Sequence, residues 1–220
     1  MGLGSIVFGT TFDLGKNTSL EYKSPLSEFG FNTVEGYHFA VPLILRTKLF
    51  ENNFRLEPTI RYAFARQKTI GKIGLHYSVK DHHLSLSGGR YVSQFNEAEP
   101  IHPIINTFTT LWLKQNFMKL YQKDFAKLGW RHRLGDKLRL EADIAWEERQ
   151  QLFNNTSHSW VDREERAFTS NAPENLSLED TGFPTHDAVI VSLQANFQPF
   201  LKYRIRNDKR RIVTENSPEF

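Results

Sequence analysis

The sequence predicts an all-β fold: an antiparallel up-and-down meander of roughly nine strands that forms part of a transmembrane β-barrel. Apolar and polar side chains alternate with a two-residue period along much of the chain, as in strands with two different faces. No run of about 18 apolar residues occurs, which excludes a helical membrane protein. Tight turns alternate with long polar connections, a pattern typical of outer-membrane barrels.

The N-terminal part of the chain contains a predicted hairpin and a long strand. Residues 5–12 and 17–22 flank Asp13–Lys16 and are expected to pair across it. Tyr37–Leu49 places its apolar residues on one face, and Glu51–Asn53 is expected to turn the chain into the following strand.

That following strand, Phe54–Phe64, alternates almost without exception. Its apolar face carries Phe54, Leu56, Pro58, Ile60, Tyr62 and Phe64, and its other face carries Arg55, Glu57, Thr59, Arg61 and Ala63. Proline has no N–H to donate to a sheet ladder, so we expect a bulge or a missing hydrogen bond at Pro58.

The later strands and connections follow from the same reasoning. The predicted strands are Ile70–Val79, His82–Val92, Phe125–Arg133, Lys137–Glu148 and Ala188–Phe197. Two connections are long. Residues 92–118 include Pro100–Phe117, whose second half is compatible with a short helix, and residues 148–185 are polar.

Composition limits the function classes. Among 220 residues, 28 Lys and Arg stand against 25 Asp and Glu with the signs mixed, so nucleic-acid binding is not expected. The basic cluster Lys202–Arg211 is interpreted as a solvated loop. The mean hydropathy of −0.50 suits a soluble protein and equally a barrel with half-apolar strands. The absence of Cys excludes disulfides and thiolate metal sites.

Aromatic residues lie near the ends of the predicted apolar faces, with aliphatic residues in mid-strand. This distribution favours the aromatic girdles of a membrane barrel over a soluble core, although a soluble β-sandwich or ligand-binding barrel stays open. In the barrel interpretation the polar faces line the lumen, and the candidate residues are Arg55, Glu57, Arg61, Lys72, His76, Arg139, Glu141 and Asp143.

A family resemblance adds to this interpretation. Its motif residues are Gly89, Arg90, Val92, Gln94, Phe95, Asn96, Asn106, Asn116, Lys119 and Tyr121. With these residues, the chain from about Asn32 to Phe220 resembles uncharacterised outer-membrane proteins of Bacteroidetes-type bacteria. In that family a carboxypeptidase-regulatory-like domain precedes a β-barrel domain of unknown function. The resemblance implies a bacterial outer-membrane location and supplies no catalytic motif.

The sequence shows neither a signal peptide nor the regulatory-like domain. The chain also stops where the family begins another strand. We therefore interpret residues 1–220 as one partial barrel domain, a fragment of a longer protein that lacks an N-terminal domain and C-terminal strands.

Enzyme motifs are weak. The sequence has no G-x-S-x-G elbow, phosphate-binding loop, dinucleotide fingerprint or H-E-x-x-H pair. Adjacent strand residues point to opposite faces, so His82 and His83 are not expected to share a metal. Ser157-His158-Ser159, in the second long connection, is the only candidate for a hydrolase site. No catalytic, cofactor or metal site is predicted.

We therefore expect a non-enzymatic outer-membrane β-barrel protein that contacts outer-membrane lipid and needs no cofactor. It would anchor or assemble an envelope protein, or pass a ligand. One alternative is a soluble β-barrel or sandwich that binds an apolar ligand, and a second is an outer-membrane lipid hydrolase.

Overall fold

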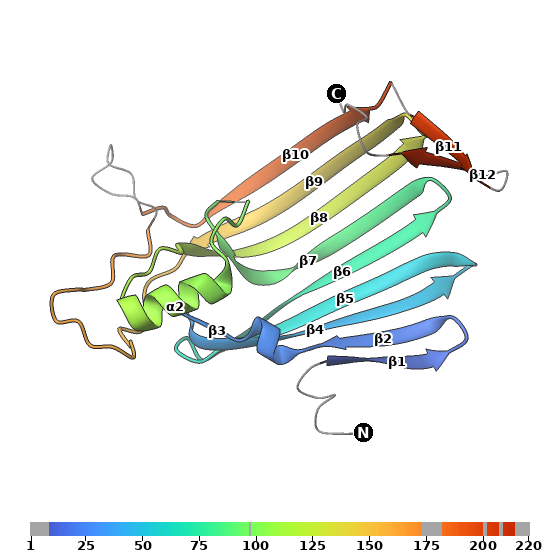
Figure 1. Cartoon of the computed structure of the whole chain (residues 1–220). Coiled ribbons are helices and arrows are strands. Elements are labelled where there is room, and N and C mark those ends of the chain that lie inside the picture. Colours follow the sequence, from blue (N-terminus) through green and yellow to red (C-terminus); the bar gives the residue numbers. More distant parts are fainter. Residues whose placement is uncertain (1–8, 97, 173–181, 200–201, 207–208, 214–220) are drawn as a thin grey trace.

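The structure is a computed structural model that describes residues 9–96, 98–172, 182–199, 202–206 and 209–213. Its main feature is one long, curved antiparallel sheet (Figure 1). The strands along it are β1 (Gly9–Gly15), β2 (Thr18–Lys23), β4 (Gly36–Leu49), β5 (Asn52–Ala63), β6 (Lys68–Val79), β7 (His82–Gln94), β8 (Leu120–Leu134), β9 (Leu138–Gln151) and β10 (His186–Phe197).

Each of these strands pairs with its neighbour in that order, and the short strand β3 (Gly30–Asn32) pairs with β4 beyond the end of β2. The predicted meander and the N-terminal hairpin are thus confirmed. Within the described residues β1 and β10 each pair with one strand only, so the sheet is open.

The two ends of the sheet differ. At one end, here called the turn end, tight turns join β1 to β2, β4 to β5, β6 to β7 and β8 to β9. The turn between β4 and β5 lies at Phe50 and Glu51, with φ values of 49° and 63°, one residue earlier than expected. Positive φ at both central residues is typical of hairpin turns that match the twist of the strands.

The other end, here called the loop end, carries the longer connections at residues 24–35, 95–119 and 152–185, with a short turn at residues 64–67. The 3₁₀-helix η1 (Pro25–Glu28) and the helix α2 (Pro103–Leu113) lie here (Figure 1). A short helix in the first long connection is thus confirmed, although it begins and ends earlier than expected. The principal cluster of buried apolar residues is also here: Val34, Ile70, Val92, Met118, Leu120 and Leu152.

Pro58 interrupts the ladder on one side only. β5 pairs with β6 through Pro58, opposite Ile73, whereas its pairing with β4 stops at Pro42–Thr59 and resumes at Leu45–Leu56. The register is the same on both sides of this gap, so no residue is inserted. The expected missing bond is therefore confirmed, and the alternative of a bulge is wrong.

The two faces of the sheet are chemically opposite. On one face, here called the outer face, a single register row of apolar side chains crosses all nine strands of the meander: Phe12, Leu20, Leu45, Leu56, Leu75, Leu86, Leu128, Ile144 and Val191. Neighbouring rows add Phe54, Tyr77, Leu84, Trp130 and Trp146, and several of these rings and aliphatic chains are exposed. No second layer of the described chain covers this face.

The basic cluster near the C-terminus differs from its prediction. Its described backbone forms a two-stranded sheet of β11 (Lys202–Arg206) and β12 (Lys209–Val213) instead of a loop. The end of the stretch that resembles the family, residues 214–220, lies outside the described residues. None of the described helices is long and apolar enough to cross a bilayer.

Candidate functional site

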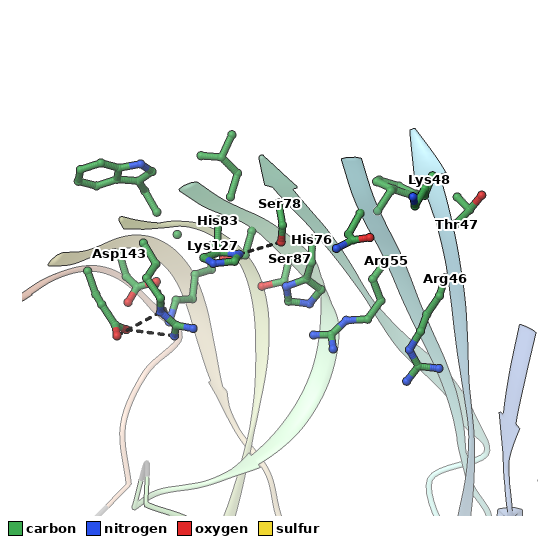
Figure 2. Close-up of a pocket in the computed structure, with 18 of the residues that line it drawn as sticks. Arg46, Thr47, Lys48, Arg55, His76, Ser78, His83, Ser87, Lys127 and Asp143 are labelled. Atoms are coloured by element: carbon green, nitrogen blue, oxygen red, sulfur yellow. Dashed lines mark hydrogen bonds and ion pairs between the residues drawn. The ribbon is translucent and has the colours of Figure 1, made fainter. Parts of the chain in front are cut away.

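The polar face of the sheet forms a hollow of about 870 Å³ that we call the polar groove. Its lining comes from β2 and from each strand between β4 and β9, so the sheet curves around its polar face. Figure 2 shows Arg46, Arg55 and His76 projecting from neighbouring strands on the same side. These residues share a side because β4, β5 and β6 pair Arg46 with Arg55 and Arg55 with His76.

Ion pairs between neighbouring strands run along the groove. Arg46 binds Glu21 at 2.6 Å, His76 approaches Glu57 at 3.3 Å, and Lys127 approaches Asp143 at 3.4 Å. Glu141 accepts a hydrogen bond from Arg131 of β8 at 3.1 Å, and it forms an ion pair with Arg139 of its own strand at 3.0 Å. Such half-exposed pairs contribute little stability each, about 0–1 kcal/mol. Together they leave a strongly hydrated wall with charges of both signs.

All of the sequence-predicted lumen candidates lie on this polar face. The pairing of Arg55 with His76, Thr59 with Lys72 and Arg131 with Glu141 brings them together. The groove itself contains Arg55, His76, Glu141 and Asp143, whereas Arg61 and Lys72 lie nearer the loop end. The faces of the strands therefore agree with the alternation read from the sequence.

At the loop end, the polar face holds a buried carboxylate that the sequence did not reveal. Glu35, in the turn before β4, is 0% exposed and forms an ion pair with Arg61 of β5. The side chain of Asn32 shapes this turn, because its Oδ1 accepts from the backbone N–H groups of Val34 (3.0 Å) and Glu35 (2.7 Å). Its Nδ2 donates to Glu35 Oε2 at 2.8 Å.

The charge of Glu35 is stabilised by these partners. Burial by itself raises the pKa of Glu35, but the charge of Arg61, the nearby His38 and the Asn32 hydrogen bond outweigh it, so the net shift lowers the pKa. Glu35 Oε1 and Arg61 Nε have no hydrogen-bond partner among the described residues.

A cap that includes this carboxylate joins the two sides of the curved sheet. We define the cap as residues 31–35, α2 and residues 152–172. The backbone N–H of Asn155, beyond β9, donates to Thr33 O at 2.8 Å, and its side chain donates to Val34 O at 2.8 Å. The ends of β9 and β4 thus meet, although four strands separate them in the sheet.

Asparagine side chains, and not backbone hydrogen bonds between strands, attach the cap. Asn116 donates to Thr169 O at 2.8 Å and accepts from Thr169 N at 3.0 Å. Asn171 accepts from Leu120 N at 2.9 Å and donates to Leu120 O and Leu152 O, each at 2.7 Å. Both side chains satisfy backbone groups that would otherwise be buried without partners.

The other motif residues also have structural contacts at the loop end. Gln94 both donates to and accepts from the backbone of Ile101, and Lys119 donates to Thr169 and Ser170. Asn96 forms a turn with Ala98, Tyr121 packs against Phe95, and Arg90 forms an ion pair with Asp124. Asn106 bridges Phe31 O and Met118 N.

Gly89 has a steric role in the same motif. Its φ is +139°, and a Cβ at this position would lie 2.3 Å from the carbonyl oxygen of Gly71 on the neighbouring strand. Only glycine fits so close an approach between β6 and β7. The motif residues therefore specify how the cap and the loop end are built.

His82 and His83 lie on opposite faces of the sheet. His83 contacts Ser78 Oγ at 2.8 Å on the polar face, whereas His82 stacks on His132 and Trp130 on the outer face, so the predicted opposite orientations are confirmed. In the described parts of the chain, no group of three or more His, Cys, Asp and Glu side chains is arranged to hold a metal.

The candidate hydrolase segment is held by aromatic and backbone contacts. The ring of His158 packs against Phe31 and Tyr37, with Nε2 3.5 Å from the Tyr37 hydroxyl. Ser159 donates to Val161 O at 3.1 Å. The contacts described for these side chains pair neither serine with the imidazole, and they give a hydrolase no geometric support.

Comparison with known proteins gives one result. Residues 4–220 match the C-terminal domain of DUF5686, a family of unknown function. The chain belongs to this family. Neither curated proteins nor solved structures give a match. Membership in DUF5686 confirms the predicted relation to an uncharacterised family, and it assigns no activity to the polar groove.

Sequence reasoning missed the residues that make the DUF5686 cap specific, above all Asn32, Glu35 and Asn171. A signal for the first two was present, because an Asn followed three residues later by Glu is typical of a side-chain-stabilised turn. No comparable signal existed for Asn171, since its partners Leu120 and Leu152 come from distant parts of the chain.

Proposed function

We propose that this chain forms part of the wall of a bacterial outer-membrane β-barrel, with its outer face toward lipid and its polar groove toward the lumen. The observation that carries the proposal is the apolar row across the meander, which has the polar groove directly behind it. In a soluble protein a comparable exposed apolar surface would need a covering partner. In a bilayer, lipid covers it.

The height of the apolar surface agrees with this role. Along β8 the outer face is apolar or aromatic from Ala126 to Leu134 apart from His132, which stacks on Trp130. At about 3.4 Å per residue this stretch measures about 27 Å along the strand. With a strand tilt of about 40°, the stretch spans about 21 Å along the membrane normal, close to the apolar band of outer-membrane barrels, which is about 25 Å tall and flanked by aromatic girdles.

The polar groove favours this role over the soluble alternative. A protein that binds an apolar ligand inside a β-barrel needs an apolar interior. Here the hollow side carries Arg46, Arg55, Lys127 and Arg131, and the exposed side is apolar. We therefore propose a non-enzymatic envelope role, in which the domain anchors or assembles an envelope protein or passes a polar solute along the groove.

Paired single-cysteine variants test the proposal, because the chain has no Cys of its own. Leu193→Cys labels the outer face of β10, where Leu193 is 80% exposed, and Gln194→Cys labels the polar face one residue later. In membranes, a water-soluble maleimide should label only Gln194→Cys, and a lipid-soluble maleimide should label Leu193→Cys. Equal labelling of both by the water-soluble reagent would refute the proposal.

A further inference from the structure

The helix α2 buries a largely polar face and exposes an apolar face. Its buried face carries Asn106 and Thr110, which are 2% and 0% exposed, together with Leu111. The opposite face carries Ile104, Ile105, Phe108 and Trp112, and all of these are exposed. A surface helix of a soluble protein has the reverse arrangement, with its apolar stripe against the core and its polar side chains in water.

Two polar residues of α2 form hydrogen bonds with the backbone at the edge of the sheet. Thr107 Oγ1 accepts from Phe31 N at 2.9 Å, and Asn106 Nδ2 donates to Phe31 O at 3.2 Å. These bonds satisfy the edge of β3 as a neighbouring strand would. The helix therefore occupies a position beside the wall of strands, next to β3, as Figure 1 shows.

The exposed face of α2 belongs to a larger aromatic surface, which we call the α2 patch: Ile104, Ile105, Phe108, Trp112 and Trp160. The Trp112 and Trp160 rings meet edge to face with their centroids 5.5 Å apart. Trp160 Nε1 donates to the hydroxyl of Tyr37 at 2.8 Å.

Tyr37 connects the α2 patch with the outer face. It lies on the same side of β4 as Phe39, whose ring clusters with those of Tyr62 on β5 and of Phe64 directly after β5. The α2 patch therefore extends the apolar face of β4 and β5 toward the loop end. Along this path no polar interval separates the two surfaces.

Positive charge lies at the C-terminal end of the helix. Arg163 Nε donates to Trp112 O at 3.4 Å, and Arg166 Nη1 donates to Leu113 O at 3.0 Å. These cations are favourable near the negative end of the helix dipole. The same segment also carries Asp162, Glu164 and Glu165, and Lys114 pairs with Asp162 at 3.3 Å, so charges of both signs lie in the segment next to this end of the helix.

From these observations we infer that α2 is an interfacial helix, which lays the α2 patch into the headgroup region of the bilayer at the rim of the wall. The inference rests on the proposed function, because the bilayer that the patch would meet is the one that the outer face contacts. Trp and Tyr rings concentrate at this level of membrane proteins, where an apolar body and a polar N–H or O–H are both satisfied. The occupant of the patch is therefore lipid, and not a partner protein.

The four tryptophans of the chain allow a direct test. Variants that keep a single Trp, at position 112, 160 or 146, are reconstituted in vesicles of zwitterionic and anionic phospholipid with bromine at defined acyl positions. Trp146 lies on the outer face of β9 and reports on the proposed wall. Trp146 pairs with Ala126 at the loop-end edge of the apolar band, so we expect bromines just below the headgroups to quench Trp146, and the shallowest bromines to quench Trp112 and Trp160 most strongly.

The outcomes distinguish the inference about α2 from the proposal that the outer face meets lipid. If Trp146 is quenched while Trp112 and Trp160 respond only to aqueous quenchers, the inference about α2 is wrong and the wall stands. If no bromine quenches any of the three, both fail. Placing Asp at Ile105 and Phe108 should abolish the quenching of Trp112 and leave that of Trp146 unchanged. Ser157→Asp, elsewhere in the cap, is the matched control and should change neither.

Discussion

Replacing Val191 by Arg tests which medium the outer face meets. Val191 ends the apolar row on β10 and is 64% exposed within the described chain. Complete burial of a Val side chain is worth about 1.5–3 kcal/mol, so in water the remaining third accounts for about 0.5–1 kcal/mol. An Arg on the lipid face near the bilayer midplane costs about 2–4 kcal/mol. The two media thus predict effects that do not overlap.

The matched variant is Ser192→Arg, which places the same side chain one residue later on the exposed polar face of the same strand. Urea unfolding of the protein folded into phospholipid vesicles should give Val191→Arg a loss of about 2–4 kcal/mol, or roughly 30-fold to 1,000-fold in the folding equilibrium. Ser192→Arg should stay within about 0.5 kcal/mol. Equal losses below about 1 kcal/mol for both variants would show that lipid does not cover this face.

Three further substitutions test the loop end by chemical unfolding. Gly89→Ala should destabilise by about 1–3 kcal/mol because its Cβ would collide with the neighbouring strand, whereas Gly15→Ala, with nothing within 4 Å, should be neutral. Asn171→Ala should cost about 2–3 kcal/mol, since backbone groups of the cap lose their partners. Glu35→Gln should cost about 3–5 kcal/mol by leaving Arg61 buried without its counterion. Because folding lowers the pKa of Glu35, its stabilisation should be complete above the ordinary value of 4.5 and fade as the pH falls toward the folded-state pKa; Glu35→Gln should remove that part of the pH dependence.

The faces of the strands could be predicted because they depend on a local, two-residue period. Arg55, Glu57 and Arg61 share one face of β5 whatever that strand pairs with, and the tight turns then fix its register with β4 and β6. The interruption at Pro58 followed from chemistry within one residue. Local sequence therefore specified the meander and its two faces.

The cap could not be predicted in the same way. Its hydrogen bonds join Asn155 to Thr33, Asn116 to Thr169 and Asn171 to Leu120, residues that lie far apart in the chain. An asparagine in a polar connection resembles any solvated loop residue until its partner is known. The motif residues marked this region as specific, but their roles required the three-dimensional arrangement.

The boundary of the apolar surface gives a further physical argument for tilted strands in a membrane. On β4 and β5 the outer face remains apolar or aromatic through Val41 and Ile60 to the Phe39–Tyr62 pair. The register row of Ile60 continues through Gly71 of β6 to Arg90, Asp124 and Glu148 of β7, β8 and β9, where the face becomes charged. The boundary thus runs obliquely to the register rows. The proposed wall of tilted strands accounts for this boundary, because a level bilayer surface crosses its register rows obliquely.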